Sequence, residues 1–466
     1  MVTGAGLRAE PLALVNEGLG NSSYLVALGD GRALAVDPER DPGPYLTAAE
    51  SRGLTIAFAA ETHLHADFVS GSRELAAHGA QVLAAAEGGS GFGHRGLRDG
   101  DEVDLGGLRL RALATPGHTP EHLSYLLLDG DRPAALFSGG SLLVGAVART
   151  DLIAPERTGE LARALWRSLH ERILTLPDDL PVYPTHGAGS FCAAPASAER
   201  TTTIGAQRAA NPLLAAASED EFVRLLLDGL GTYPPYFLRL REVNRSGPAV
   251  LGTVPAALPA LTPEEVWHLA GAGAAAGLID ARPAASFAAG HIPGAISIPL
   301  RPAFATWLGW LTDPDRPAVF VLEQGQDRAD LIRQARNIGY ERLAGELAGG
   351  MATWQAAGLP VRQISVVRAS EVTGPVLDVR QAAEYSSGHL PDARHIELGA
   401  LTTAGTAASA EPDPGARPVT LMCGAGDRAM TAASLLARRG HPGLAVAVGS
   451  PEDWAAAHDR PLETDP

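Results

Sequence analysis

Short apolar runs alternate with turns rich in glycine, proline and histidine over the first 250 residues. Runs of this kind predict β-strands, because short apolar segments bounded by turn residues are typical of sheets. The predicted strands are 23–27, 33–36, 108–114 and 123–128. In the segment 159–174, leucine and isoleucine recur instead at helical spacing, which predicts an amphipathic helix.

A proline-rich segment at 246–263 predicts a linker, and the sequence repeats itself after it. The segment 279–282 matches 377–380, and 290–295 matches 388–393, both with an offset of 98 residues (378 − 280 and 388 − 290). This period equals a small domain and exceeds that of solenoid repeats. Each copy alternates strands with helices, which predicts a duplicated domain whose parallel sheet is covered on both faces.

Length, charge and cysteine content narrow the function classes. A chain of 466 residues predicts about three domains. The formal charge of −16 argues against nucleic acid as a partner, because phosphate binding needs a positive surface. No apolar run approaches the ~20 residues that span a membrane, and the first ten residues lack a basic segment followed by an apolar core, so we expect no secretory signal. Two cysteines, Cys192 and Cys423, are too few for a disulfide framework, so we expect a cytoplasmic protein.

Imidazole and carboxylate side chains gather in turns that follow predicted strands of the N-terminal region. These side chains are His63, His65, Asp67, His118 and His186. Imidazole and carboxylate are ligands that suit zinc or iron, and a turn after a strand can bring several of them to one point. The turns therefore predict a candidate metal site.

A second candidate site lies in the C-terminal repeat. The apolar strand 419–422 leads into Cys423, and a glycine-rich loop then opens a predicted helix at 429–438. A thiol at this point faces backbone N–H groups and the positive end of the helix, and both favour the thiolate. Arg428 closes the loop and adds a cation. The pattern predicts a reactive cysteine.

This pattern resembles the rhodanese family of single-cysteine sulfurtransferases. The resemblance covers both repeats, through their Asp-x-Arg, Gly-His-hydrophobic-Pro-x-Ala and Gly-x4-Trp elements. It implies that Cys423 accepts a sulfane sulfur as a persulfide, with Arg428 as its catalytic partner. The substrate-binding loop would comprise Gly424, Ala425, Gly426 and Asp427. The first repeat carries Glu323 in the cysteine position, and we expect it to be silent because a carboxylate cannot carry a persulfide.

The N-terminal region resembles the metallo-β-lactamase superfamily at its three histidine-containing turns. Within that superfamily, the segments 66–71 and 186–190 are most similar to the persulfide dioxygenase branch. Phe68 stands where glyoxalase II enzymes usually carry a histidine of a second metal site. The resemblance therefore implies one metal ion and argues against a two-metal hydrolase.

In that branch the resemblance implies an iron ion held by two histidines and one aspartate. The histidines would be His63 and His118, but the segment 137–142 places Gly140 where the aspartate is expected. We expect Fe(II), with His65 as the third ligand. Zinc is the alternative, because three histidines and a water molecule also suit it. A third reading is that no metal is bound, because Gly140 replaces the ligand.

Three further residues are predicted to lie around this metal site. Asp67 and His186 would be close neighbours that orient ligands or substrate. Arg149 would bind a substrate carboxylate or pair with Asp151.

Together the resemblances predict an α/β chain of three domains. Residues 1–250 would form the αββα sandwich of the metallo-β-lactamase superfamily, and 262–363 a silent rhodanese-like domain. Residues 366–463 would form an active rhodanese domain around Cys423, again with a parallel sheet. This order is that of bacterial persulfide dioxygenase–sulfurtransferase fusions, which implies a role in sulfide detoxification. The expected chemistry is oxidation of a persulfide to sulfite with O₂, coupled to sulfur transfer at the cysteine.

Two alternatives stay open. The N-terminal site could be degenerate and only bind or scaffold, or the domain could be a zinc-dependent thioester hydrolase. The expected partners are low-molecular-weight persulfides, thiosulfate or other sulfane sulfur donors, and thiol acceptors. We expect no nucleic acid and no membrane as a partner, and a homo-oligomer stays open.

Overall fold

The computed structural model describes residues 10–193, 198–270, 277–402 and 419–465. These residues divide into two compact units. The first unit runs to Val254 and also takes in Arg333–Gly339, and the second comprises Pro255–Ile332 and the chain from Tyr340 onward. None of the helices in the described segments is long and apolar enough to cross a membrane.

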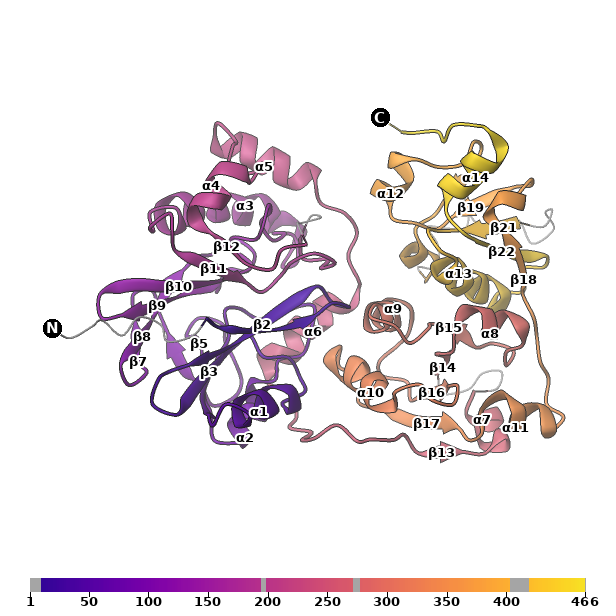
Figure 1. Cartoon of the computed structure of the whole chain (residues 1–466), viewed down its shortest axis with the longest axis horizontal. Coiled ribbons are helices and arrows are strands. Elements are labelled where there is room, and N and C mark those ends of the chain that lie inside the picture. The colour runs from indigo at the N-terminus through magenta and orange to yellow at the C-terminus, as the bar shows by residue number, and fades with distance from the viewer. Residues whose placement is uncertain (1–9, 194–197, 271–276, 403–418, 466) are drawn as a thin grey trace. The chain divides into compact units, whose positions relative to one another are not determined.

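Two six-stranded sheets form the middle of the first unit (Figure 1). The first sheet has the order β1 (Leu12–Asn16), β2 (Asn21–Ala27), β3 (Arg32–Val36), β4 (Thr55–Ala60), β5 (Gln81–Ala85) and β6 (Arg95–Leu97). The second has the order β12 (Thr202–Thr203), β11 (Pro181–Pro184), β10 (Arg132–Gly139), β9 (Leu123–Asp129), β8 (Leu108–Ala114) and β7 (Glu102–Asp104). The four strands predicted from the sequence are confirmed, since they fall within β2, β3, β8 and β9.

Strand β9 shows why these strands are apolar along their whole length. Successive side chains of a strand point to opposite faces of its sheet. Tyr125 and Leu127 therefore lie in the core between the two sheets. Leu126 and Leu128 lie in a second core on the other face, under the helices. Both faces of the sheet are thus covered, and neither tolerates the polar alternation of a half-exposed strand.

Helices cover the outer face of each sheet (Figure 1). The first sheet packs against α1 (Gly43–Glu50) and α2 (Ser72–Ala77). The second packs against α3 (Thr158–Ser168), α4 (Ile204–Ala210) and α5 (Glu219–Asp228), and α6 (Tyr236–Ser246) follows along the chain. The helix predicted at 159–174 is confirmed as α3 and a wider π-helical turn at Leu169–Ile173. The layers have the predicted αββα order.

The second unit contains two five-stranded sheets with the same topology. The first copy has the order β13 (Ala260–Leu261), β17 (Leu343–Leu347), β16 (Ala318–Val321), β14 (Gly277–Asp280) and β15 (Ile296–Ser297). The second has the order β18 (Ser365–Arg368), β22 (Leu444–Val448), β21 (Val419–Met422), β19 (Val376–Asp378) and β20 (Arg394–His395). All neighbouring strands are parallel. The predicted duplication of a parallel-sheet domain is confirmed.

Each copy surrounds its sheet with helices in corresponding places. The first copy has α7 (Pro263–Ala270), α8 (Ala284–Ala289), α9 (Phe304–Leu311) and α11 (Gly350–Ala356). It also has α10 (Arg328–Asn337), of which the part from Arg333 onward belongs to the first unit. The second has α12 (Ala382–Ser387), α13 (Asp427–Arg438) and α14 (Pro451–His458). Because α13 begins directly after β21 and the loop at Cys423, its N-terminus points its free N–H groups toward that loop.

A buried ion pair explains the repeated Asp-x-Arg element. In the second copy the Arg380 guanidinium donates to both carboxylate oxygens of Asp378, at 2.7 to 3.0 Å, and to the carbonyl of Gly388, at 2.7 Å. Asp280 and Arg282 repeat this arrangement in the first copy. Both aspartates lie fully inside the fold. The pair joins the end of a central strand to the turn after the next helix, so the repeated residues serve the fold.

Removing one member of this pair should destabilise the second unit. Asp378→Ala leaves the buried Arg380 without its charge partner and is expected to cost about 3 to 5 kcal/mol of unfolding free energy. Urea unfolding of the full chain, followed by circular dichroism, measures the change. Glu371→Ala is the matched control, because its pair with Arg368 is exposed and should contribute less than about 1 kcal/mol. Equal losses in the two variants would contradict the role of the buried pair.

Candidate functional site

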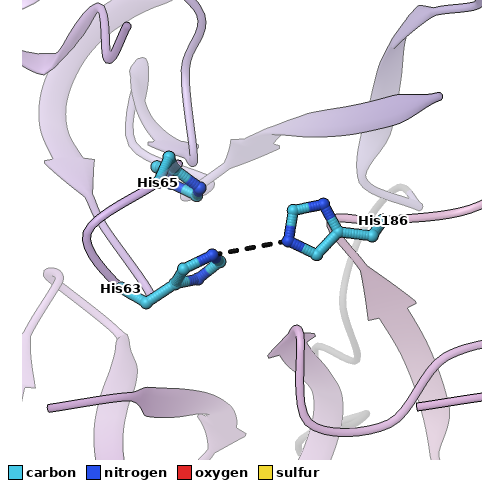
Figure 2. A group of neighbouring side chains, drawn as sticks. All are labelled: His63, His65 and His186. Carbon is cyan, nitrogen blue, oxygen red and sulfur yellow. Dashed lines mark hydrogen bonds between the residues drawn. The ribbon is translucent and has the colours of Figure 1, made fainter. Parts of the chain in front are cut away.

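Three histidine rings from three different loops meet at one end of the first unit. His63 follows β4, His118 follows β8 and His186 follows β11. The ring centroids lie 4.8 Å apart for His63 and His118, 5.4 Å for His63 and His186, and 5.3 Å for His118 and His186. All three residues are buried. Figure 2 shows His63 and His186 pointing toward each other, with their Nε2 atoms 3.4 Å apart.

His118 keeps one nitrogen free in the interior. Its Nδ1 donates a hydrogen bond of 2.6 Å to the carbonyl of Arg149, because a carbonyl oxygen can only accept. Its Nε2 is buried and has no hydrogen-bond partner among the described residues. Burial, helped by the nearby His186, lowers the pKa of His118 to about 3, so the ring stays neutral. A neutral imidazole whose second nitrogen is fixed by a carbonyl is the usual form of a metal ligand.

His65 sits between two carboxylates. Its Nε2 lies 3.0 Å from Glu61 and 3.3 Å from Asp37. Burial alone would lower the pKa of His65, but Asp37 and then Glu61 outweigh it and raise the pKa to about 10. Phe68 stacks on the ring at 4.2 Å and is fully buried. His65 groups with His63 and His186, not with His118, so its role as the third ligand beside His118 stays a prediction.

Asp67 and an asparagine hold His186 in position. Asn21 donates to Asp67 at 2.8 Å, and the Nδ1 of His186 lies 3.0 Å from Asn21 Oδ1 and 3.3 Å from Asp67 Oδ2. Burial favours the neutral acid, but the neighbouring His186 and His65 hold the pKa of Asp67 well below its usual value. These contacts leave the Nε2 of His186 directed at His63. Asp67 thus lies where an orienting residue is expected, whereas His186 lies among the candidate ligands themselves.

Gly140 makes room for the His118 ring. A Cβ atom at this position would lie 2.6 Å from Cδ2 of His118 and 3.1 Å from the Cβ of Ala148. The Gly140 N–H donates to Nε2 of His122 at 2.9 Å, and His122 Nδ1 contacts Thr115 Oγ1 at 2.8 Å. Both nitrogens of His122 are therefore occupied, so this ring offers no metal ligand. It stacks on the ring of His63 and supports the site in this way.

Cys192 is a site residue that sequence reasoning missed. Its sulfur, the imidazole of His118 and the imidazole of His186 lie within 4.8 Å of one another, and the thiol is fully buried. Burial, and then the charge of Asp67, raises the pKa of this thiol well above its usual value. Its place six residues after His186, in the same loop, was the available signal.

Arg149 supports the site through its backbone and its side chain. Its guanidinium makes two bonds to Asp151, of 2.6 and 2.7 Å, and donates to the carbonyls of Phe191 and Gly231. It also lies over the ring of Tyr233, 4.4 Å from its centroid. The ion pair is therefore the alternative that the contacts favour, and substrate binding by Arg149 stays a prediction.

The Cys423 loop connects β21 to the N-terminus of α13. Cys423 is 2% exposed and its Sγ accepts a hydrogen bond of 3.1 Å from the N–H of Gly426. Gly426 has a φ of +108°, a conformation that favours glycine, and α13 starts at the next residue. Arg428 donates two hydrogen bonds to Glu384, of 2.6 and 2.8 Å. This pairing fixes the guanidinium at the base of the loop.

The rest of this loop opens to a cleft. Ala425, Gly426 and Asp427 line it, and Asp427 also pairs with Arg301 at 3.3 Å. Gly424 lies in the same loop and is exposed. In the first copy, Glu323 stands in the cysteine position and Arg328 pairs with Glu346 instead. The substrate-binding role of residues 424–427 stays a prediction.

Adding a side chain at Gly140 should disturb the histidine cluster. Gly140→Ala forces the His118 ring to move and is expected to cost about 1 to 3 kcal/mol of unfolding free energy, as overpacking does. Urea unfolding measures this, and an aspartate at 140 carries the same steric cost. The control is Gly159→Ala in α3, where nothing lies within 4 Å of the new Cβ and stability should stay equal or rise by up to ~1 kcal/mol. A neutral Gly140→Ala variant would contradict this contact.

Comparisons with known proteins agree with this architecture. Residues 262–357 and 366–457 match the family model of the rhodanese-like domain. The chain is 32% identical over 209 residues to the human mitochondrial persulfide dioxygenase ETHE1, and the matched segment covers 44% of this chain and 75% of that protein. It is 37% identical over 165 residues to a hydroxyacylglutathione hydrolase of Methylococcus capsulatus, covering 34% of this chain and 58% of the hydrolase.

Solved structures show the same fold. A metallo-β-lactamase structure from Staphylococcus aureus superimposes with a TM-score of 0.62 and 29% identity, covering 72% of this chain and 98% of that one. Together with the rhodanese-like matches, these relatives indicate an enzyme of sulfur metabolism. The chain belongs to the persulfide dioxygenase family of the metallo-β-lactamase fold, and it carries two rhodanese-like domains fused to that domain.

Proposed function

We propose that this chain oxidises a low-molecular-weight persulfide to sulfite at a metal ion in its first unit and transfers sulfane sulfur at Cys423 in its second. The observation that carries the first half is the buried, unpartnered Nε2 of His118 beside His63 and His186. Burying a polar atom without a partner costs free energy, and a bound cation removes that cost. The second half rests on the thiol at the N-terminus of α13.

The donor atoms of the histidine cluster fit a metal ion. Two imidazole nitrogens that each lie about 2.0 to 2.1 Å from a shared ion can be at most about 4 Å apart. The Nε2 atoms of His63 and His186 are separated by 3.4 Å. We propose His63, His118 and His186 as holders of the ion, with His65 as a further candidate. Iron(II) is the proposed ion, and when bound it supplies the oxidising chemistry with O₂.

The residues of the chain have distinct tasks in this reaction. Asp67 and Asn21 orient His186, and the carbonyl of Arg149 orients His118. Phe68 packs on His65 and fills the place of a second metal ligand, which favours oxidation over two-metal hydrolysis. The balanced reaction is R–S–SH + O₂ + H₂O giving R–SH + SO₃²⁻ + 2 H⁺, in which the outer sulfur is oxidised and O₂ is reduced.

Sulfur transfer follows from the Cys423 loop. The Cys423 thiolate attacks the outer sulfur of R–S–SH, so that a new S–S bond forms on Cys423 and the S–S bond of the donor breaks. The electron pair leaves with R–S⁻, which takes up a proton. The N–H of Gly426 and the N-terminus of α13 favour the attacking thiolate. Because both units share one chain, the intermediate that they exchange has a raised effective concentration.

Removing the thiol should end the transfer activity. Cys423→Ser is expected to abolish transfer of sulfur from thiosulfate or glutathione persulfide to cyanide, because serine cannot hold a persulfide. Thiocyanate formation measures the reaction. The matched control is Glu323→Ala at the corresponding position of the first copy, which should leave the rate unchanged. Transfer that survives in Cys423→Ser would overturn the assignment.

Oxygen uptake tests the metal site. Iron-loaded wild-type protein should consume one O₂ for each glutathione persulfide, measured with an oxygen electrode. Loss of a residue that only hydrogen-bonds to a metal ligand typically reduces activity by roughly 10- to 100-fold. His118→Ala removes a proposed ligand itself and should reduce oxygen uptake by more than this. His78→Ala is the control, because that histidine is exposed at the end of α2.

A zinc-dependent thioester hydrolase is the second candidate, favoured by the resemblance to the hydroxyacylglutathione hydrolase and by the all-histidine cluster. It predicts hydrolysis of a glutathione thioester by zinc-loaded protein and no oxygen uptake. A third outcome, neither activity with intact sulfur transfer, would leave the first unit as a binding module.

A further inference from the structure

Among the described residues, no carboxylate joins His118 and His186 in a candidate metal-binding group, although Asp37 and Glu61 form one with His65. Gly140 lacks a side chain where the resemblance leads us to expect an aspartate. The carboxylates of Asp37 and Glu61 face His65, and Asp67 bonds to Asn21 and faces His186. A divalent cation held by imidazoles alone would lose the charge compensation that a carboxylate supplies. An anion must therefore come from elsewhere in the chain or from solvent.

Cys192 lies where such an anion is needed. Among the described residues, its sulfur forms one candidate metal-binding group with His118 and His186, all within 4.8 Å of one another and all buried. The unpartnered Nε2 of His118 is an independent sign that a ligand belongs there. Sulfur and imidazole together suit zinc, iron and cobalt better than they suit magnesium or calcium.

The backbone of Arg149 fixes both sides of this group. Its carbonyl accepts the Nδ1–H of His118 at 2.6 Å, and its N–H donates to the carbonyl of Cys192 at 2.8 Å. The Cys192 N–H in turn donates to Ser190 Oγ at 3.1 Å. The segments of Cys192 and His118 are therefore both held by the backbone of one residue, Arg149, which explains their closeness.

The glycine at 140 and the position of Cys192 are connected through the ring of His118. The ring of His118 occupies the space that a side chain at 140 would take, since an added Cβ would lie 2.6 Å from it. A carboxylate at 140 and the present position of His118 therefore exclude each other. With glycine at 140, His118 can stand beside His186 and Cys192.

We infer that Cys192 replaces the absent carboxylate and forms, with His118 and His186, a two-histidine, one-thiolate metal site. This inference rests on the proposed function, because it needs the first unit to bind a metal. On binding, the thiol loses its proton to solvent and a sulfur–metal bond forms, so one anionic ligand is retained. No electron is transferred in this step. The Nε2 of His63 lies 3.4 Å from that of His186, and its ring centroid lies 4.8 Å from that of His118, so His63 stays available as a further ligand.

Cobalt(II) titration of the full-length protein under anaerobic conditions tests the inference without relying on activity. A thiolate ligand gives a near-ultraviolet charge-transfer band, whereas imidazole ligands give only the weaker visible bands. Wild-type protein should show the charge-transfer band at one equivalent of cobalt. Cys192→Ser should lose that band, and Cys192→Asp should bind cobalt through a carboxylate without it. Cys423→Ser should keep the band, because that thiol belongs to the other unit.

The possible outcomes separate the two proposals. Cobalt that binds to wild-type protein without a charge-transfer band would overturn the thiolate ligand and leave the metal site standing. A band that persists in Cys192→Ser, or disappears in Cys423→Ser, would also overturn it. Wild-type protein that binds neither cobalt nor iron would overturn the metal site itself. The wild-type and Cys423→Ser spectra decide the matter even if the Cys192 variants fail to fold.

Discussion

The hydrogen bond from His118 Nδ1 to the carbonyl of Arg149 is the interaction on which the N-terminal site depends. It fixes the tautomer of the ring, so that a lone pair on Nε2 faces the interior. A buried nitrogen without a partner costs about 1 to 3 kcal/mol. The same residue holds the loop of Cys192 and, through its guanidinium, Asp151 and Gly231. One residue thus connects the segments that surround the candidate metal ion.

The two copies in the second unit share the residues that stabilise the fold but differ in the residue at the cysteine position. Both copies keep the buried ion pair that organises the sheet, at Asp280 and at Asp378. Only the second copy keeps a thiol at the end of its central strand, and there Arg428 is tied to Glu384. In the first copy Arg328 is tied to Glu346 and Glu323 stands in the thiol position. The fold therefore survives the loss of the nucleophile, because the residues that stabilise it lie elsewhere.

The sequence predicted those features of the fold that depend on the local pattern of residues along the chain. Apolar runs and the offset of 98 residues between the repeats predicted the strands and the duplication, because apolar pattern and period can be read along the chain. The αββα layers were predicted from the resemblance to the metallo-β-lactamase superfamily. The residues that sequence reasoning missed depend on contacts between distant loops. The closeness of Cys192 to His118 arises from two hydrogen bonds to Arg149, and the clash at Gly140 arises from the position of one ring. The spacing of Cys192 from His186 places it in the same loop, but it does not reveal the contact with His118, and nothing in the spacing reveals the clash at Gly140.

The central claim is that the buried histidine cluster holds one metal ion with a sulfur ligand. X-ray absorption at the zinc edge of the full chain loaded with one equivalent of zinc tests it most directly. The spectrum should show imidazole nitrogens at about 2.0 to 2.1 Å, with the outer-shell scattering of the rings, and one sulfur at about 2.3 Å. A first shell without sulfur, or one of oxygen scatterers without imidazole features, would contradict this site.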